Sequence, residues 1–209
     1  MRQNLEYYQA VSKYLDETRD LLANLDSEDI GAIIEAILKA QRDGVKIFVL
    51  GNGGSASTAS HFVTDLGKGV IPTEGSRFKM YSLTDNVPLI TAWANDAGYE
   101  RIFEEQLENL VEEGDVVIGI SGSGNSPNVL RAMELARARR ALAIGLTGYQ
   151  GGKLKALCDL CVVVPSEHMD QIENVHMILQ HLICIVSRDI LLSVPALSVA
   201  NGPNGGKAW

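Results

Sequence analysis

Residues 46–66 read KIFVLGNGGSASTASHFVTDL and combine an apolar run, a glycine-rich turn and a helical segment. The apolar run, 47–50, is bounded by Gly44 and Gly51 and predicts a buried strand of a parallel sheet. Glycines in the turn allow a sharp bend and leave backbone N–H groups uncovered. Because those groups would lie at a helix N-terminus, the turn predicts a site for an anion or a polyhydroxylated ligand. A tight turn without a ligand would use the same glycines, so this segment alone leaves both interpretations open.

A second copy of this arrangement lies further along the chain. The apolar run 115–120 leads into GISGSGNS, residues 119–126, which offers three serine hydroxyls among glycines. Pro127 suits the first turn of a helix, and Ser126 is a good N-cap that could also donate to a phosphate oxygen. Neither turn has the Lys-Ser/Thr of a P-loop, nor GxGxxG followed about 20 positions later by an acidic residue. The two turns therefore favour a sugar phosphate over a nucleotide.

These motifs carry a resemblance to a known family. GNGGS at 51–55 and GISGSGNS at 119–126, with His61 shortly after the first, resemble the sugar isomerase (SIS) domain family, most closely its phosphoheptose isomerase members. The likeness extends from about Glu6 to Leu192. Further matching segments are Asn95-Asp96, Leu146-Thr147-Gly148, Gly151-Gly152-Lys153, Asp170-Gln171-Ile172-Glu173 and His181. The resemblance implies an aldose–ketose isomerase that converts sedoheptulose 7-phosphate to D-glycero-D-manno-heptose 7-phosphate through an enediol.

Strongly apolar segments alternate with helical ones after the first turn. Strands are expected near 47–50, 79–83, 116–120, 142–147 and 160–164. This alternation predicts an α/β fold, with a doubly wound five-stranded parallel sheet, flavodoxin-like as in the SIS fold, flanked by helices and with an added N-terminal helix. A single SIS domain is expected over residues 1–193, including N-terminal helices at 4–43, with a loose tail at 194–209.

Composition excludes several classes of partner. The net charge of −8 argues against a nucleic-acid or anionic-membrane surface, which would need a basic stripe. The start MRQNLEYY is neither a signal nor a transit peptide, and no apolar run is expected to approach the 18 or more residues of a membrane span. A cytoplasmic protein is expected. Cys158, Cys161 and Cys184 are too few and too apolar in their surroundings for a disulfide framework, and plain packing is favoured.

Two helices carry a signal for assembly. The N-terminal one has an apolar seam that could pack along a helix of another subunit or on the chain's own sheet. Its members are Tyr8, Val11, Leu15, Thr18, Leu22 and Leu25. Ser27 is expected to cap a second helix, 28–42. The C-terminal helix, from Asp170 to about Leu192, is apolar nearly all round, which indicates burial, most simply between subunits.

Catalysis needs ionisable groups near the two turns. His61 and Asp65 are four residues apart on a predicted helix and share a face. An aldose–ketose isomerase needs one group to take a carbon-bound proton and another to manage the oxygens. The resemblance assigns the base to a glutamate at the position of Asp65 and the acid to a histidine at the position of His181. Asp65 is one methylene shorter, and a misplacement of about 1 Å can cost on the order of a hundredfold in rate.

The resemblance also implies which residues bind substrate. Ser121, Ser123 and Ser126 would hold the phosphate, and Gly122 stands where the family often has threonine. The sugar would be bound by Asn52, Gly53, Gly54, Ser55, Asn95, Asp96, Asp170 and Glu173.

Four side chains near the two turns are also predicted to bind a metal ion. His61, Asp65, Glu173 and His181 offer two imidazoles and two carboxylates, which suits Zn²⁺ or another borderline divalent ion. The isomerases that this chain resembles usually carry glutamine at the position of Glu173, so Glu173 adds negative charge to this set. Alternatively, this extra carboxylate pairs with a histidine and holds it protonated.

One helix cannot easily supply both distal ligands. Glu173 and His181 are eight residues apart, which places them about 12 Å apart along a helix and about 80° around it. A site shared with a neighbouring subunit is therefore expected, most simply in a homotetramer of dihedral symmetry. In a rival arrangement, Glu173 and His176 bind metal within one chain. A rival function is a non-catalytic SIS protein of the replication-initiator-associating type, which binds a sugar phosphate or a protein partner.

Overall fold

Five parallel strands form one sheet in the order β2-β1-β3-β4-β5. The computed structural model describes residues 2–72 and 76–193. Its strands are β1 (Lys46–Gly51), β2 (Lys79–Ser82), β3 (Val116–Ser121), β4 (Leu142–Gly148) and β5 (Leu160–Val164). Its helices are α1 (Arg2–Ala23), α2 (Ser27–Asp43), α3 (Gly54–Thr64), α4 (Val87–Asp96), α5 (Glu104–Glu108), α6 (Pro127–Ala138), α7 (Gly152–Leu157) and α8 (Met169–Ser193), with a π-helical turn η1 (Asp65–Gly69) and a 3₁₀ turn η2 (Tyr99–Arg101). The predicted doubly wound fold and all five strand positions are confirmed.

The strand order places both glycine-rich turns together. β1 pairs with β3 in parallel, with Gly51 opposite Ile120, so the two turns leave the same edge of the sheet from adjacent strands. The chain turns to one side after β1 and to the other after β3. A crevice at such a switch point is where open α/β sheets bind their ligands. The expectation that the two turns share one site is therefore consistent with the topology.

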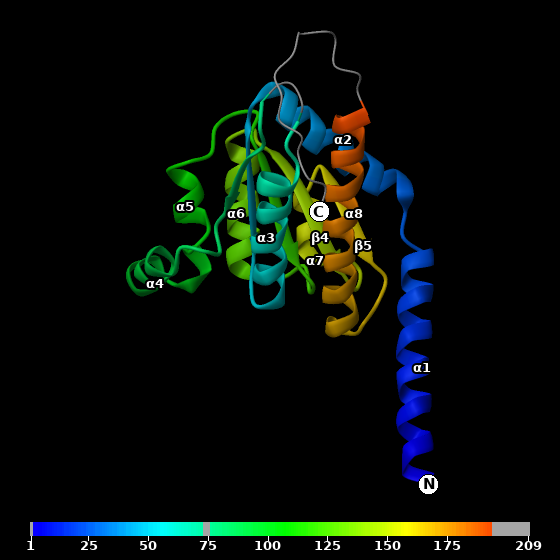
Figure 1. Ribbon diagram of the computed structural model, residues 1–209. Coiled ribbons are helices and arrows are strands. Elements are labelled where there is room, and N and C mark those ends of the chain that lie inside the picture. The colour runs from blue at the N-terminus through cyan, green and yellow to red at the C-terminus, as the bar shows by residue number, and fades with distance from the viewer. Residues whose placement is uncertain (1, 73–75, 194–209) are drawn as a thin grey trace.

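Alternating residues of each strand supply two separate cores. In β1, Ile47 and Val49 face a core made with α2, α3 and α8, whereas Phe48 and Leu50 face a core made with α5, α6 and α7. All four side chains are fully buried. Helices therefore cover both faces of the sheet (Figure 1). The face with α3 and α8 is the one that carries the ionisable groups described below.

The second helix begins one residue earlier than expected. The carboxylate of Asp26 accepts a hydrogen bond from the backbone N–H of Glu28, which makes Asp26 the N-cap of α2. Ser27 is therefore the first helical residue and not the cap, which corrects the prediction. Aspartate and serine are both strong N-caps, so two adjacent candidates leave a shift of one residue undecided by sequence.

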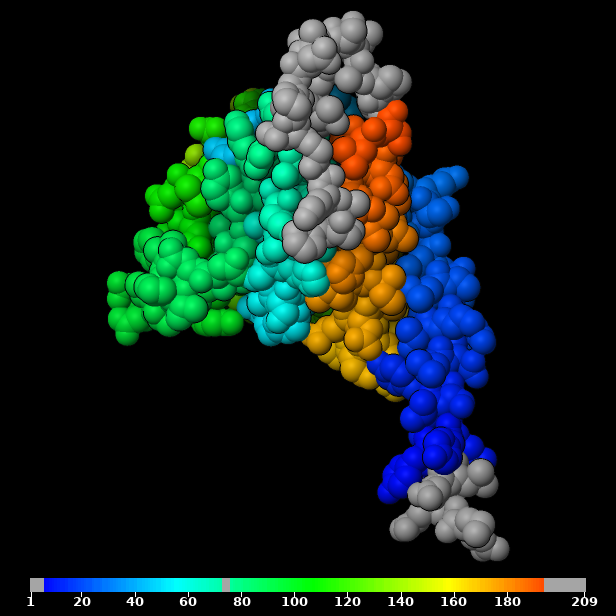
Figure 2. Space-filling view, viewed as in Figure 1, coloured from blue at the N-terminus to red at the C-terminus, as the bar shows by residue number. Residues whose placement is uncertain are grey.

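Helix α1 projects away from the body of the molecule along its N-terminal half (Figures 1 and 2). Tyr8, Val11 and Leu15 on this half are exposed, by 71%, 58% and 61%. Leu22 and Leu25, at the other end of the predicted seam, pack against the core beside α8. The seam is thus divided: its C-terminal part packs on the chain's own core, and the described residues do not cover its N-terminal part.

Helix α8 packs beside α3 on one face of the sheet and contributes to the core on that face. Ile172, Val175, Leu179 and Ile183 are buried on its inner side. The helix has 25 residues, and an 18-residue stretch of it has a mean hydropathy of 1.5. By length and composition alone, such a helix could cross a membrane. The expectation that no segment approaches such a span is therefore wrong. Core helices meet the same criterion, and packing on the sheet accounts for the apolar residues on the inner side of α8.

The cysteines are free thiols, as plain packing predicts. The described residues contain three free cysteines, of which Cys184 is buried and Cys158 and Cys161 are half-buried. Burial raises the pKa of Cys184 to about 12, which keeps this thiol protonated.

The tail expected at 194–209 lies outside the described residues. The single domain over 1–193 stays a prediction.

Candidate active site

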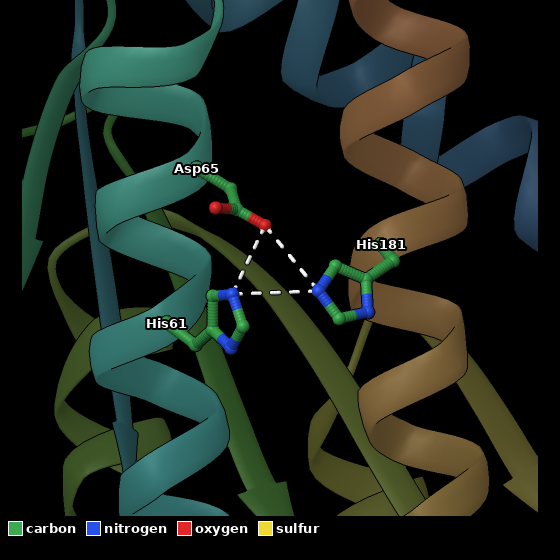
Figure 3. A group of neighbouring side chains, drawn as sticks. All are labelled: His61, Asp65 and His181. Carbon is green, nitrogen blue, oxygen red and sulfur yellow. Dashed lines mark hydrogen bonds and ion pairs between the residues drawn. The ribbon is translucent and has the colours of Figure 1, made fainter. Parts of the chain in front are cut away.

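Three ionisable side chains converge between α3 and α8 (Figure 3). His61 lies on α3, Asp65 begins the π-helical turn at its end, and His181 lies on α8. The Nε2 atoms of the two histidines are 3.3 Å apart. Oδ2 of Asp65 lies 3.4 Å from Nε2 of His61 and 3.6 Å from Nε2 of His181. We call these residues the His-Asp-His group; it is the one group of at least three possible metal ligands among the described residues.

The spacing of these three atoms fits a tetrahedral metal ion. Ligands bound at about 2.0 to 2.2 Å in a tetrahedron lie about 3.3 to 3.6 Å from one another, which matches the distances within the group. Two neutral imidazole nitrogens and one carboxylate oxygen are also the donors that Zn²⁺ prefers. The three side chains are between 31% and 45% exposed, so a fourth ligand position has room for water or substrate. The group has the composition of a catalytic metal site with three protein ligands.

His181 meets His61 and Asp65 within one copy of the chain, which bears on the prediction that the metal site is shared between subunits. The option in which a neighbouring subunit brings His181 to His61 and Asp65 is wrong. Glu173 does not join the His-Asp-His group. The geometric argument that one copy of α8 cannot direct both residues to one ion agrees with this arrangement.

Glu173 lies instead against the first glycine-rich turn. A Cβ atom added to Gly54 would come within 2.7 Å of both oxygens of the Glu173 carboxylate. Gly54 is the first residue of α3, so this carboxylate lies beside the positive end of that helix. Of the three roles predicted for Glu173, this position suits contact with the sugar. Neither metal ligation within the same chain nor an ion pair with a histidine is formed among the described residues.

His176 is part of the core and does not accompany Glu173. Its side chain is fully buried, and its Nε2 atom lies 3.2 Å from the carbonyl oxygen of Thr147 on β4. Nδ1 is buried with no hydrogen-bond partner among the described residues. Burial lowers the pKa of His176 to about 4, against a smaller opposite effect of the Thr147 carbonyl. The rival metal pair of Glu173 and His176 is therefore not formed.

The first turn is fixed by a network that reaches the second. Gly53 has φ 55° and ψ −120°, a conformation for which glycine is needed. The side-chain amide of Asn52 exchanges two hydrogen bonds of 2.8 Å with that of Asn128 on α6. Tyr99 donates its hydroxyl to Oδ1 of Asn52 at 3.1 Å. Asn52, which was expected to bind the sugar, is thus held by Asn128 and Tyr99, two residues that were not predicted to lie at the site.

The second turn gathers the predicted phosphate ligands. Oγ of Ser121 lies 3.1 Å from Oγ of Ser126, the N-cap of α6, although the Ser126 side chain makes no capping bond to its own helix. Oγ of Ser123 accepts a hydrogen bond from the backbone N–H of Asn125. Gly124 has φ 63°, and a Cβ there would lie 2.2 Å from the carbonyl oxygen of Gly151. The turn thus brings three hydroxyls to the N-terminus of a 12-residue helix, which favours an anion.

The other predicted sugar ligands are spread over the same edge. Ser55 is buried at the start of α3, and Gly122 lies under Met169. Asp170 is exposed in the first turn of α8. Asn95 and Asp96 are exposed at the end of α4, where Asn95 donates to Asp96 at 2.7 Å. Within the described residues, no hydrogen bond or ion pair joins any of these five to the His-Asp-His group.

Three residues near the site had weak signals in the sequence. Asn128 follows Pro127 at the start of α6, directly after the second turn, and Tyr99 lies close after the matched Asn95-Asp96 pair. Gln180 is a polar residue on the inner side of an apolar helix, and it donates a hydrogen bond of 2.8 Å to Oδ2 of Asp65. Only the last signal, a buried amide beside a predicted catalytic residue, could have been noticed from periodicity.

Burial of His176 predicts a loss of stability in mild acid. In the unfolded chain this imidazole takes up a proton below its ordinary pKa near 6.5, whereas in the folded protein it does so only near 4. Stability should therefore fall as the pH drops from about 6.5 towards 4, by about 2 kcal/mol at pH 5 from this residue alone. His176→Gln keeps a donor for Thr147 and should lose about 2 kcal/mol less than wild type between pH 7.5 and 5 in urea unfolding at fixed protein concentration. Equal losses in both proteins would contradict a neutral buried histidine.

Comparisons with known proteins agree with this geometry. A family model described as the SIS domain matches residues 6–148. A phosphoheptose isomerase of Aliarcobacter butzleri is 45% identical over 143 residues, which are 68% of this chain and 75% of that protein. A phosphoheptose isomerase of Trichlorobacter lovleyi is 36% identical over 184 residues, which are 83% of this chain and 90% of that protein. The solved structure of phosphoheptose isomerase GmhA from Neisseria gonorrhoeae has a TM-score of 0.80 and 30% identity, and covers 87% of this chain and 98% of that chain.

Proposed function

The chain belongs to the SIS domain family, and from this premise we propose that it is a sugar phosphate isomerase acting on sedoheptulose 7-phosphate. Its product would be D-glycero-D-manno-heptose 7-phosphate. The observation that carries the proposal is the His-Asp-His group, which offers a carboxylate and two imidazoles on the same face of the sheet as the first glycine-rich turn. Such a group suits proton transfer between adjacent carbons.

The rise of α3 from the first turn to His61 is compatible with the length of a seven-carbon substrate. The serine turn and the glycine turn leave adjacent strands at one edge, and His61 lies seven residues, about 10 Å, along α3 from Gly54. In an extended 2-ketoheptose 7-phosphate, the phosphorus lies about 9 Å from the carbonyl carbon by ordinary bond lengths. A phosphate at Ser121 and Ser126 would therefore leave the reacting carbons near the His-Asp-His group.

The chemistry divides between the two oxygens of Asp65. Oδ2 faces both imidazoles, and Oδ1 makes no hydrogen bond among the described residues, so we assign to Oδ1 the acceptance of the proton from C1 of the ketose. The proton returns to C2, and the aldose results. His181, whose Nε2 faces the other two members of the group, would exchange a proton with the substrate oxygens. A divalent metal such as Zn²⁺ held by His61, Asp65 and His181 would polarise the substrate carbonyl.

A direct assay tests this function. The purified protein is given a panel of ketose phosphates of five, six and seven carbons, and aldose formation is followed by NMR. We expect turnover of the seven-carbon ketose, its loss after treatment with a chelator, and its recovery with Zn²⁺. Ligand binding without turnover of any ketose phosphate, with and without added Zn²⁺, would favour a non-catalytic SIS protein instead.

Uncovered apolar surfaces support a homotetramer as the working assembly. The N-terminal half of α1 is exposed, α4 has no buried residue, and α8 exposes Ile178, Leu182 and Ile185 on the side away from the sheet. Exposed apolar areas of this kind mark protein interfaces. We place the assembly in the cytoplasm, with dihedral symmetry as its simplest form.

Mixed tetramers test which residues share a site. Asp65 and His181 lie in one chain, so mixing Asp65→Asn subunits with His181→Ala subunits should restore no activity. Asp96 is exposed at the end of α4, and no hydrogen bond or ion pair among the described residues joins it to the His-Asp-His group, so we assign its predicted sugar contact to the site of a neighbouring subunit. Random mixing of Asp65→Asn with Asp96→Ala subunits should then restore about one quarter of the wild-type activity. Recovery in the first mixture, or none in the second although subunits demonstrably exchange, would contradict this assignment.

A further inference from the structure

Gln180 is a fully buried amide in direct contact with Asp65. It precedes His181 on α8, and its side chain has no exposed surface. Nε2 donates a hydrogen bond of 2.8 Å to Oδ2 of Asp65 and lies 3.4 Å from Sγ of Cys184. Oε1 is buried and has no hydrogen-bond partner among the described residues. This amide therefore makes one strong contact, and that contact is to the predicted base.

Burial of such an amide does not help the fold. An unpaired buried carbonyl oxygen destabilises a protein, and an apolar side chain of similar volume avoids this penalty. The neighbouring inner residues of α8, Leu179 and Ile183, show that apolar side chains fill this layer. A polar residue that is unfavourable for packing points to a role in the site beside it.

The hydrogen bond determines how the Asp65 carboxylate is oriented. Oδ2, which accepts from Gln180, is the same oxygen that faces Nε2 of His61 and Nε2 of His181. The amide approaches from the protein interior, whereas the two imidazoles lie on the partly exposed side. The carboxylate is therefore held between one buried donor and two imidazoles, and Oδ1 is left without a partner among the described residues.

We propose that Gln180 is a positioning residue that fixes the short carboxylate of Asp65 and so compensates for the methylene that a glutamate would add. This inference rests on the proposed function for its kinetic consequences, but not for its geometry. A donor behind a metal-binding carboxylate orients the ligand, and loss of such a donor typically lowers activity or metal affinity 10- to 100-fold. Gln180 would act entirely through Asp65 and would not touch the substrate.

The test compares two buried glutamines of the same helix. Gln180→Met keeps the length of the side chain and removes the donor, and Gln171→Met is the matched control. Gln171 is 4% exposed and bonds to Ser166 and Glu17, not to the His-Asp-His group. We expect Gln180→Met to lower kcat 10- to 100-fold with KM within about twofold, and to weaken Zn²⁺ binding 10- to 100-fold in competition with a chromophoric chelator. The control should keep kcat and Zn²⁺ affinity within about twofold of wild type.

A second substitution distinguishes positioning from general damage. Asp65→Glu in the Gln180→Met background lengthens the carboxylate and should recover at least about tenfold of the lost kcat and Zn²⁺ affinity. Equal effects of the two methionine variants, or failure of glutamate to recover either quantity, would overturn the proposal. If the wild type isomerises no ketose phosphate, the proposed function fails, and the Zn²⁺ measurements still decide: unchanged affinity in Gln180→Met overturns the positioning role.

Discussion

Asp65→Asn is expected to lower kcat for ketose isomerisation by about 10³-fold, within the 10²- to 10⁴-fold range for loss of a general base. The amide has nearly the same shape, and its oxygen can still accept the hydrogen bond that Gln180 now donates to Oδ2. It cannot take up the proton from C1. We assign the substrate hydroxyls and phosphate to other elements, so the dissociation constant for the sugar phosphate should change little.

Proton exchange separates this chemical step from binding. In D₂O, wild type should introduce deuterium at the carbons that exchange the proton, and Asp65→Asn should do so about 10³-fold more slowly. Asp16→Asn is a suitable control, because Asp16 is an exposed carboxylate on α1 that pairs with Arg19. Turnover and exchange at the wild-type rate in Asp65→Asn would show that another group is the base.

Ser121→Ala and Ser123→Ala are each expected to raise KM for the sugar phosphate about 10- to 150-fold. A hydrogen bond to a charged group contributes about 1.5 to 3 kcal/mol, and each 1.4 kcal/mol corresponds to about tenfold in affinity. The effect should be larger for Ser121, because this side chain is 4% exposed and is held 3.1 Å from Ser126 before any ligand binds. Ser123 is partly exposed and has to be ordered on binding.

The phosphate itself is the variable in the measurement. Binding of the phosphorylated ketose and of the same ketose without phosphate is compared by calorimetry, with Ser12→Ala on the exposed side of α1 as the control. The two turn variants should weaken only the phosphorylated ligand. If both ligands lose the same affinity, or neither does, these serines do not hold the phosphate.

Much of the fold follows from local patterns along the chain. The five strands were predictable because buried parallel strands are continuous apolar runs, and the two turns because glycines and serines follow those runs directly. The pairing of His61 with Asp65 also depends on one helical turn only. The residue at which α2 begins was less certain, because Asp26 and Ser27 are adjacent and are nearly equally good N-caps. Composition alone could not distinguish α8 from a membrane span, because core and membrane helices bury similar side chains.

Contacts between distant residues depended on how the helices pack. His61 and His181 are 120 positions apart, and only the packing of α8 beside α3 brings their Nε2 atoms to 3.3 Å. The same packing carries Glu173 to the start of α3 and away from the His-Asp-His group, and it buries Gln180 beneath Asp65. Periodicity fixes the face on which a side chain lies, but not the rotation and axial offset of one helix against another. Those two quantities come from side-chain packing over the whole interface, and they decide which ligands meet.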